Sequence, residues 1–462
     1  MVATSQPTAT AAGLDMLRRG GSAADAALAA AAMLTVTEPM ATGPGGDMFA
    51  LVFAGGQVEA IDSAGPAPRD AEPAPPDRYG PRSVTVPGAV AGWEMLAQRH
   101  GRLGLEACLQ PAIRTARGGF AVGTRCASAW ATAPNLPEGF RPAPAPGDRI
   151  SLPELGATLT GIAEAGPGAF YGGRVGQAIC KVTWLAPDDL RAHRAKIVEP
   201  LALPYAGHVV LELPPPTQGI AALEALGLLA HTDGTLSAQI NCCRLALEDA
   251  FRDVRDGSDV RSLIASEAVA RRVREPPRLA FEPGGATVYL CAVDDDGMAV
   301  SLVQSLYERF GSGVVAPETG VILHNRGFGF DVAGVVAPGE RPYHTIIPGM
   351  LLTADGELRG PFGVMGGFIQ AQAHMQLVHG LLDEGLDPQT ALDRPRFRVS
   401  GRRVLLEQGL WEHAEEVARL GLEPVAETNT YLFGGGQVIL RNDQGTLIGG
   451  SDSRKDGYAA GW

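Results

Sequence analysis

The sequence predicts a protein of mixed α and β structure with a large hydrophobic core. Apolar residues make up 45% of the 462 positions and charged residues only 19%, a balance typical of a folded chain. Segments with helical features alternate with short runs of apolar and β-branched residues, as in proteins whose helices pack on sheets. The length corresponds to two or three average domains or to one large α/β unit.

The net charge of the chain and the spacing of its cysteines exclude some classes of partner and of metal or redox site. A net charge of −13 argues against nucleic acid or an anionic membrane as the main partner, because both repel an acidic surface. We therefore expect a small-molecule substrate. The six cysteines lack the CxxC or Cys/His spacing of zinc and redox sites, so we interpret them as reduced core residues.

The apolar segments carry no membrane signal. The chain does not begin with a basic segment followed by an apolar one, so no secretion leader is indicated and we expect a cytoplasmic location. The longest apolar run, residues 26–36, is rich in alanine and too short to span a bilayer.

Two helices are expected at the start of the chain. Residues 7–19 have a proline in the first turn, and Gly20-Gly21 ends the segment. Ser22 is a favourable N-cap for a second, alanine-rich helix. A glycine-rich loop at 43–46 then leads to a short apolar strand at 51–54. Glycines there let the backbone pass close to a ligand or to another strand.

The middle of the chain contains further helices and two irregular segments. Helices are expected over 220–229 and 246–253, whereas 137–148 is rich in proline and predicts a surface loop. From about residue 271 to residue 285 the periodicity is lost and prolines and glycines accumulate. Such a segment suits a linker before a cleavage point, because a scissile bond is strained or mobile rather than held in a ladder.

The strongest local signal is a β-hairpin near residue 290. Two apolar runs, 286–293 and 298–305, flank a tight turn that ends in Asp-Gly. Antiparallel pairing about this turn brings Ser305 opposite Thr287 or its neighbour. Two hydroxyls at one end of a ladder fit either a packed core or a catalytic pair, and the hairpin alone favours the core.

A glycine pair, Gly366-Gly367, precedes a helix expected over 370–382. Backbone N–H groups at the positive end of a helix can bind an oxyanion. Close helix packing explains the same two glycines equally well.

Other catalytic motifs do not fit this chain. The nine histidines include no HExxH, and Gly311-Ser312-Gly313 lacks the Gly-x-Ser-x-Gly spacing of a nucleophile elbow. No Gly-Lys-Ser/Thr follows the loop at 43–46, which excludes a phosphate loop. Three carboxylates at 294–296 could bind calcium, but at the tip of a turn solvation is their more common state. We therefore expect no metal site.

Several motifs along the chain, taken together, identify a family resemblance. They lie at residues 20–27, 38–39, 43–47, 86–93, 110–113, 166–171, 211–219, 363–368 and 449–462. In this order they resemble the γ-glutamyltranspeptidase family, and the match covers roughly the whole chain.

The resemblance implies a fold and a maturation step. The implied fold is a four-layer αββα sandwich of the N-terminal nucleophile hydrolase type, built jointly by residues 1–286 and 287–462. The precursor would cut itself between Ala286 and Thr287, and the large and small fragments would stay associated. Thr287 would then be the nucleophile.

An N-terminal threonine carries its own base. Its α-amino group, with an unperturbed pKa of about 7.7–8.0, can take the proton of its own hydroxyl near neutral pH without a histidine, metal or cofactor. By the same resemblance, Ser305 would orient the hydroxyl and hold the amine. The N–H groups of Gly366 and Gly367 would stabilise the oxyanion.

Some positions depart from the transpeptidases proper. Those enzymes hold the α-carboxylate of a γ-glutamyl donor with an arginine from the segment that corresponds to 61–68, and this chain has none there. Val288 replaces a second threonine, and His344-Thr345 replaces a serine pair near the pocket. These differences resemble a less characterised branch of the family that includes an oxamate amidohydrolase.

Candidate substrate-binding residues follow from the same comparison. Arg326 and Arg341 could anchor a substrate carboxylate, and an ordinary salt bridge explains each of them equally well. Tyr307, His344 and Thr345 could line the pocket or belong to the core.

Three hypotheses remain. The first is a self-processing enzyme that cleaves γ-glutamyl or similar small amides through an acyl-threonine and passes the acyl group to water or an amine. The second keeps this chemistry but uses a short oxo-acid amide or a bulky acylase substrate. The third is an unprocessed, inactive homologue that serves as a binding protein. A homo-oligomer is compatible with each of them.

Overall fold

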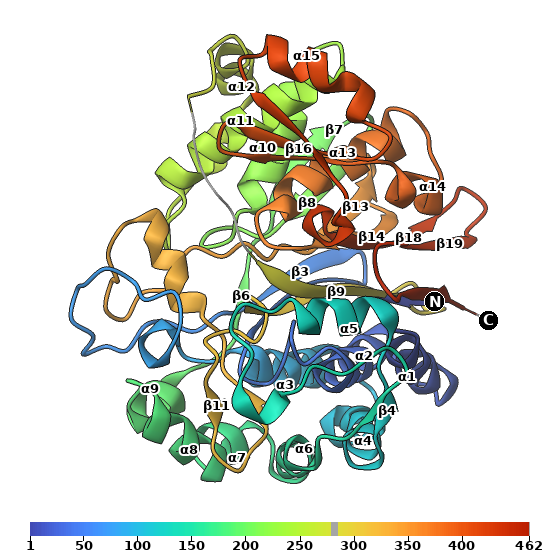
Figure 1. Cartoon of the computed structure of the whole chain (residues 1–462). Coiled ribbons are helices and arrows are strands. Elements are labelled where there is room, and N and C mark those ends of the chain that lie inside the picture. The colour runs from blue at the N-terminus through green and yellow to red at the C-terminus, as the bar shows by residue number, and fades with distance from the viewer. Residues whose placement is uncertain (279–284, 462) are drawn as a thin grey trace.

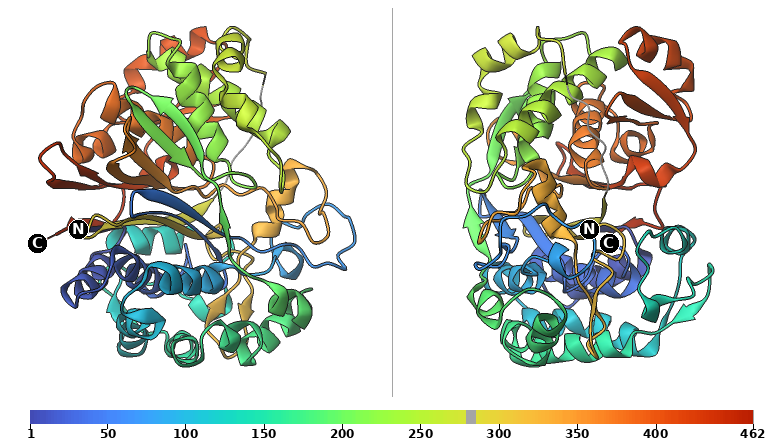
Figure 2. Two further views of the ribbon diagram at one scale, coloured as in Figure 1. Left: turned by 180° about the vertical axis from the view of Figure 1, so that it is seen from behind. Right: turned by 60° about the vertical axis from the view of Figure 1, so that its left-hand side comes forward.

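The computed structural model describes residues 1–278 and 285–461 and has the predicted four-layer architecture. Figure 1 shows a lower layer of blue and green helices, two central sheets, and an upper layer of helices coloured from yellow-green to red. The two ends of the chain lie side by side at one edge of the central sheets, as both views in Figure 2 also show. The αββα prediction is confirmed.

The first large sheet has seven antiparallel strands in the order β20-β1-β9-β10-β2-β3-β6. They are β1 (Val2–Thr4), β2 (Asp47–Ala54), β3 (Gln57–Ser63), β6 (Lys196–Val198), β9 (Ala286–Val293), β10 (Ala299–Tyr307) and β20 (Tyr458–Ala460). The predicted hairpin forms β9 and β10 at the centre. Layers cover both faces of these strands, which explains their continuous apolar runs.

The second large sheet has six antiparallel strands in the order β19-β18-β14-β13-β8-β7. They are β7 (Leu201–Tyr205), β8 (His208–Glu212), β13 (Gly349–Thr353), β14 (Leu358–Met365), β18 (Gly435–Arg441) and β19 (Leu447–Ser451). Smaller sheets pair β4 (Phe120–Ala121) with β5 (Arg149–Ile150), β11 (Val315–Ala316) with β12 (Val321–Ile322), and β15 (Phe397–Ser400), β16 (Arg403–Glu407) and β17 (Glu423–Glu427).

The helices form the two outer layers. The helices on the side of the seven-stranded sheet are α1 (Pro7–Arg18), α2 (Ala23–Thr37), α3 (Ala89–His100), α4 (Gly104–Gly118), α5 (Thr124–Ala131), α6 (Pro153–Ala165), α7 (Pro167–Tyr171), α8 (Arg174–Val182) and α9 (Pro187–Ala192). The helices on the other side are α10 (Gly219–Leu229), α11 (Leu236–Asp253), α12 (Ser266–Arg272), α13 (Ile369–Leu382), α14 (Pro388–Asp393) and α15 (Ala414–Arg419). None of the helices within the described ranges is long and apolar enough to cross a membrane.

The start of the chain folds as predicted. Ser22 caps α2 by accepting a hydrogen bond from the Asp25 N–H, and the Asp25 side chain accepts from the Ser22 N–H in return. This capping box satisfies two amide groups that a helix start leaves unpaired. The small residues of α1 and α2 then let the two helices pack closely, since a side chain at Gly13 would crowd the Ala26 carbonyl.

Separate apolar clusters fill the spaces between the layers. One lies between the lower helices and the seven-stranded sheet, and another between the upper helices and the six-stranded sheet. A third fills the space between the two sheets, with Phe49, Tyr289, Met350 and Ile439 among its members. Burial on every side of both sheets accounts for the large apolar fraction of the chain.

Several predicted boundaries need correction. The strand expected at 51–54 begins at Asp47, and the helix expected at 246–253 begins at Leu236. The proline-rich segment 137–148 contains one short 3-10 helix, Glu138–Phe140, whose aromatic ring packs on Trp130. The start of the expected linker at 271–285 is helical, because α12 extends to Arg272. Residues 279–284 lie outside the described residues.

Both large sheets combine strands from the two sides of residue 286. Strands β9 and β10 lie between β1 and β2, and β13 pairs with β8. Because each sheet requires both parts of the chain, residues 1–286 and 287–462 build one unit rather than two domains.

Candidate active site

The two hydroxyls of the hairpin meet at one end of the central strands β9 and β10 of the seven-stranded sheet. Thr287 is the second residue of β9, and its Oγ1 lies 3.2 Å from the Oγ of Ser305 in β10. A register shift near the end of β10 lets Ser305 face Thr287, and the Tyr307 N–H donates to Ser305 Oγ at 2.7 Å. Both hydroxyls are buried. The structure therefore confirms that the predicted pair is in contact.

Tyr307 has a strained backbone. Its φ of 73° lies in the left-handed region, which is unfavourable for a bulky side chain. Such strain persists only where the surroundings enforce it, and it concentrates at functional sites. Here it follows the register shift and directs the aromatic ring toward Arg326.

Gln370 contacts Thr287, and the sequence did not predict this contact. Its Nε2 donates to Thr287 Oγ1 at 3.3 Å, and its Oε1 accepts from the Ile347 N–H at 3.0 Å. The side chain is fully buried in the first turn of α13. A polar residue in the turn that follows Gly366-Gly367 was the available signal, since the predicted oxyanion glycines would place that turn beside the predicted nucleophile.

The glycine pair lies against the segment that precedes Thr287. Gly366 and Gly367 have φ values of 130° and 74°, which favour glycine, and α13 begins two residues later. A side chain added at Gly285 would collide with the Cα of Gly367. The peptide just before Ala286 and Thr287 therefore touches the backbone of the pair.

A second glutamine links this backbone to the predicted pocket segment. Gln218 donates from Nε2 to the Thr345 carbonyl at 2.6 Å and to the Gly367 carbonyl at 3.1 Å. Thr345 and Gly367 are thereby held in one cluster. Gln218 lies in the motif at 211–219, which is part of the family resemblance. The sequence predicted no role for this residue.

Arg326 is a fully buried cation beside this cluster. Its guanidinium lies 4.3 Å from the centroid of the Tyr307 ring, and Nη1 donates to Thr345 Oγ1 at 3.4 Å. Its Nε and Nη2 have no hydrogen-bond partner among the described residues. Burial lowers the pKa of Arg326, and the neighbouring Asp47 carboxylate opposes that change. Buried unpaired donors are rare in folded proteins.

The carboxylate of Asp47 balances the buried positive charge of Arg326. Its Oδ2 lies 3.1 Å from His324 Nδ1, 3.2 Å from His344 Nε2 and 3.7 Å from Arg326 Nε, and its Oδ1 accepts from the Gly88 N–H. Burial alone would raise the pKa of Asp47, but the charge and hydrogen bonds of the two histidines hold it well below its usual range. His344 is thus a neighbour of the site through Asp47.

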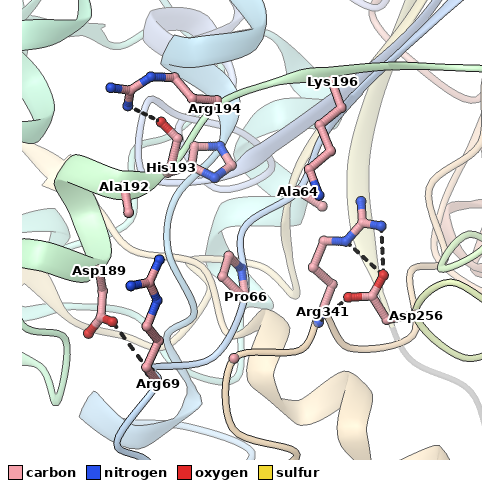
Figure 3. Close-up of a pocket in the computed structure, with 11 residues that line it drawn as sticks. Ala64, Pro66, Arg69, Asp189, Ala192, His193, Arg194, Lys196, Asp256 and Arg341 are labelled. Atoms are coloured by element: carbon pink, nitrogen blue, oxygen red, sulfur yellow. Dashed lines mark hydrogen bonds and ion pairs between the residues drawn. The ribbon is translucent and has the colours of Figure 1, made fainter.

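Arg341 lies in a different pocket, of about 210 Å³, shown in Figure 3. Its guanidinium donates to Asp256 at 2.6 Å and also to the carboxylate of Asp62. The salt-bridge interpretation of Arg341 therefore fits the structure better than a free substrate anchor. Arg69, which follows the segment that lacks the family's arginine, lines this second pocket as well.

A smaller hollow of about 150 Å³ adjoins Gly285 and Gly366. Its other lining residues are Arg78, Pro134, Glu308, Arg309, Arg398, Tyr431 and Leu432. Three arginines and one glutamate give this hollow a positive balance.

The carboxylates of the hairpin turn have structural roles. Asp294 accepts hydrogen bonds from the N–H groups of Ala23 and Met298, and Asp296 pairs with Arg102. Across residues 1–278 and 285–461, no group of three or more His, Cys, Asp or Glu side chains is arranged to hold a metal ion.

The structure therefore brings most of the predicted site residues together. One connected cluster contains Thr287, Ser305, Tyr307, Arg326, His344, Thr345 and Gly367, with Gly366 adjoining it. A hydroxyl within hydrogen-bond reach of another hydroxyl and an amide, beside a pair of glycines, suits nucleophilic attack on a carbonyl.

Comparison with known proteins gives consistent matches. The family model described as gamma-glutamyltranspeptidase matches residues 9–462. The glutathione hydrolase-like YwrD proenzyme of Bacillus subtilis is 31% identical, covering 100% of this chain and 98% of the relative. The oxamate amidohydrolase proenzyme of Klebsiella pneumoniae is 32% identical, covering 97% of this chain and 96% of the relative.

A solved structure also matches this chain over its whole length. The crystal structure of a cephalosporin acylase from Bacillus halodurans superposes with a TM-score of 0.92 at 38% identity, covering 100% of this chain and 95% of the other. Sequence and fold therefore agree over the whole chain.

Proposed function

Because the chain belongs to the gamma-glutamyltranspeptidase family, we propose that it is a self-processing amidohydrolase or acyltransferase with Thr287 as nucleophile. The observation that supports this most directly is the position of the Thr287 hydroxyl. It is held between Ser305 and Gln370 at the start of a central strand. The preceding backbone lies on the glycine pair.

In the first step the chain is its own substrate. Thr287 Oγ1 attacks the carbonyl carbon of Ala286, the hydroxyl proton moves to the departing amide nitrogen, and the peptide becomes an ester. Water then hydrolyses the ester, leaving a carboxylate on Ala286 and a free amine on Thr287. The 462-residue chain would give fragments of 286 and 176 residues.

The free amine makes the second reaction possible. With an unperturbed pKa of about 7.7–8.0 it accepts the Oγ1 proton near neutral pH. Thr287 then attacks a substrate amide, the amine of the substrate leaves with the proton, and water or another amine removes the acyl group. Ser305 keeps the hydroxyl oriented, and the N–H groups of Gly366 and Gly367 stabilise the developing oxyanion.

Arg326 favours an acyl group that carries a carboxylate. Its Nη2 has no hydrogen-bond partner among the described residues and can donate to a carboxylate, whereas its Nε lies 3.7 Å from Asp47 Oδ2. The nearby Asp47 is already engaged by His324, His344 and Arg326, so it offers little to a substrate ammonium group. We therefore favour a short oxo-acid or dicarboxylic monoamide over a γ-glutamyl donor. The oxamate amidohydrolase among the relatives agrees with this choice.

Intact-mass analysis of the purified protein tests the nucleophile. We expect two fragments that meet at Ala286 and Thr287. Thr287→Ala removes the hydroxyl and should leave one uncut chain, whereas Thr287→Ser keeps a nucleophile and should still be cut. An uncut wild-type protein would reject the proposal and support the hypothesis of an inactive binding homologue.

A panel of amides tests the acyl group. Oxamate, succinamate and γ-glutamyl-p-nitroanilide, the last with and without a dipeptide acceptor, are compared in the processed enzyme. Arg326→Gln should raise KM for the carboxylate-bearing substrates by about 10- to 100-fold, because a hydrogen bond to a charged group contributes about 1.5–3 kcal/mol. Self-cleavage should continue, since the peptide bond before Thr287 does not use this anchor. Faster turnover of the γ-glutamyl compound would reject the preference.

A further inference from the structure

Gln370 connects Thr287 to the chain segment around Ile347. Its amide group has one contact on each side: the Ile347 N–H donates to Oε1 at 3.0 Å, and Nε2 approaches Thr287 Oγ1 at 3.3 Å. The backbone of Gln370 is fixed as well, because its N–H donates to the Gly367 carbonyl. The side chain therefore occupies a single position beside the nucleophile.

These contacts determine the direction of the hydrogen bonds. A backbone N–H can only donate, so the amide oxygen of Gln370 must face Ile347 and its NH₂ group must face Thr287. Thr287 Oγ1 is thus an acceptor from Gln370. Among the described residues, the acceptor within reach of its own proton is Ser305 Oγ, at 3.2 Å. Either hydroxyl of this pair can be the donor, and Thr287 donates to Ser305 in the arrangement that uses its own proton.

We propose that Gln370 is a catalytic residue of self-cleavage, donating a hydrogen bond to the oxygen that attacks. The inference rests on the proposed role of Thr287 and deepens it. As the Oγ1–carbon bond forms and the hydroxyl proton leaves for the amide nitrogen of Thr287, negative charge develops on Oγ1 before it moves to the carbonyl oxygen. The Nε2–H of Gln370 stabilises the first of these charges, and the glycine N–H groups stabilise the second.

The same bond serves the later steps. In ester hydrolysis and in removal of a substrate acyl group, Oγ1 is the leaving oxygen and becomes negatively charged again. A donor in a buried, pre-organised position acts on each of these transition states without reorganisation. Gln370 then donates to Thr287 Oγ1, and the N–H groups of Gly366 and Gly367 donate to the carbonyl oxygen. Each oxygen that becomes negatively charged has a hydrogen-bond donor.

A purely structural role is the competing explanation. Gln370 could simply fasten the Ile347 segment to α13, in which case its loss would affect folding and not the chemistry. Gln372 provides a matched comparison, because it is another buried glutamine of α13. It fastens α13 to Val399 through both ends of its amide, and among the described residues it forms no hydrogen bond with Thr287.

The first experiment measures the rate of self-cleavage of freshly synthesised full-length chain, by denaturing gel and intact mass. Gln370→Met, which keeps the length but removes the donor, should slow cleavage about 100-fold, as loss of one oxyanion donor does. Gln372→Met should cut at nearly the wild-type rate. Equal rates for wild-type protein and Gln370→Met would overturn the inference.

The second experiment uses one variant at several pH values, so that folding differences cancel. In Gln370→Glu the ionised carboxylate can only accept, which removes the donor. The protonated acid can again donate to Oγ1 while its carbonyl oxygen accepts from Ile347. Cleavage of this variant should therefore recover as the pH falls through the titration of the new carboxyl, and Gln370→Met should show no recovery.

The two proposals fail in different ways. If wild-type protein and Thr287→Ser are cut but Gln370→Glu shows no acid recovery, the role of Gln370 is wrong and that of Thr287 stands. If wild-type protein is never cut, both are rejected.

Discussion

At the scale of single residues, the site is a small set of buried polar groups around two charges. Arg326 and Asp47 are both fully buried, and neither would be stable there alone. The histidines His324 and His344 share the carboxylate, and the Tyr307 ring covers the guanidinium. The site therefore remains ordered before any substrate binds.

This balance predicts the effect of Asp47→Asn on stability. Removing one partner of a buried ion pair typically costs about 3–5 kcal/mol, because the other charge stays buried. We expect that loss in urea denaturation at pH 7, measured in the uncut Thr287→Ala background. Asp188→Asn, at a largely exposed surface pair, should change little.

Asp47 also predicts how the stability of the folded protein depends on pH. Because the pKa of Asp47 is lower in the folded than in the unfolded chain, its ionisation stabilises the protein above the unfolded pKa of about 3.9. This contribution should be lost as the pH falls below that value. Asp47→Asn should lack this part of the acid destabilisation, and an unchanged acid profile would contradict the assignment.

At the scale of elements, close backbone contacts hold β10, the strand that carries Ser305, in place. The glycine loop at 43–46 leads directly into β2, which pairs with β10 as far as Ser305. A side chain at Gly46 would collide with the Ser305 carbonyl. The glycines of this loop predict a close approach to a ligand or to another strand, and in the structure the approaching element is strand β10.

Gly46→Ala should therefore weaken both fold and maturation. Displacing β10 by an extra methyl group should cost about 1–3 kcal/mol and move Ser305 away from Thr287. We expect a lower urea midpoint and slower self-cleavage. Gly118→Ala is the matched control, because a side chain there meets open space at the end of α4.

Local sequence patterns predicted the helices and strands better than the contacts within the candidate active site. The hairpin, the Ser22 cap and the helix after Gly367 depend on neighbours in sequence, and all three are present. Gln370 and Gln218 escaped prediction because each acts on residues that only the tertiary fold brings close. Nothing local could distinguish Arg326, which stacks on Tyr307, from Arg341, which pairs with Asp256.

At the scale of the whole molecule, the proposed cut would divide two shared sheets without separating them. Strand β9 pairs with β1 on one side and with β10 on the other. Arg341 joins Asp62 and Asp256, which lie on the other side of the cut in sequence. The interface is therefore a continuous part of the core.

We expect the fragments to remain together. In size-exclusion chromatography under native conditions the processed protein should elute where the uncut Thr287→Ala variant does, and a denaturing gel should then resolve both pieces. Fragments expressed separately should fail to fold, because each lacks strands of both sheets. Separation of the processed pieces without denaturant would contradict this prediction.

The contact between Gly285 and Gly367 has a consequence for timing. In the proposed mechanism, the chain's own peptide bond before Thr287 occupies the place where a substrate amide would react, so the uncut protein would be inactive. Because the proposed nucleophile and its target carbonyl belong to the same strand, the rate of activation would depend neither on protein concentration nor on any protease.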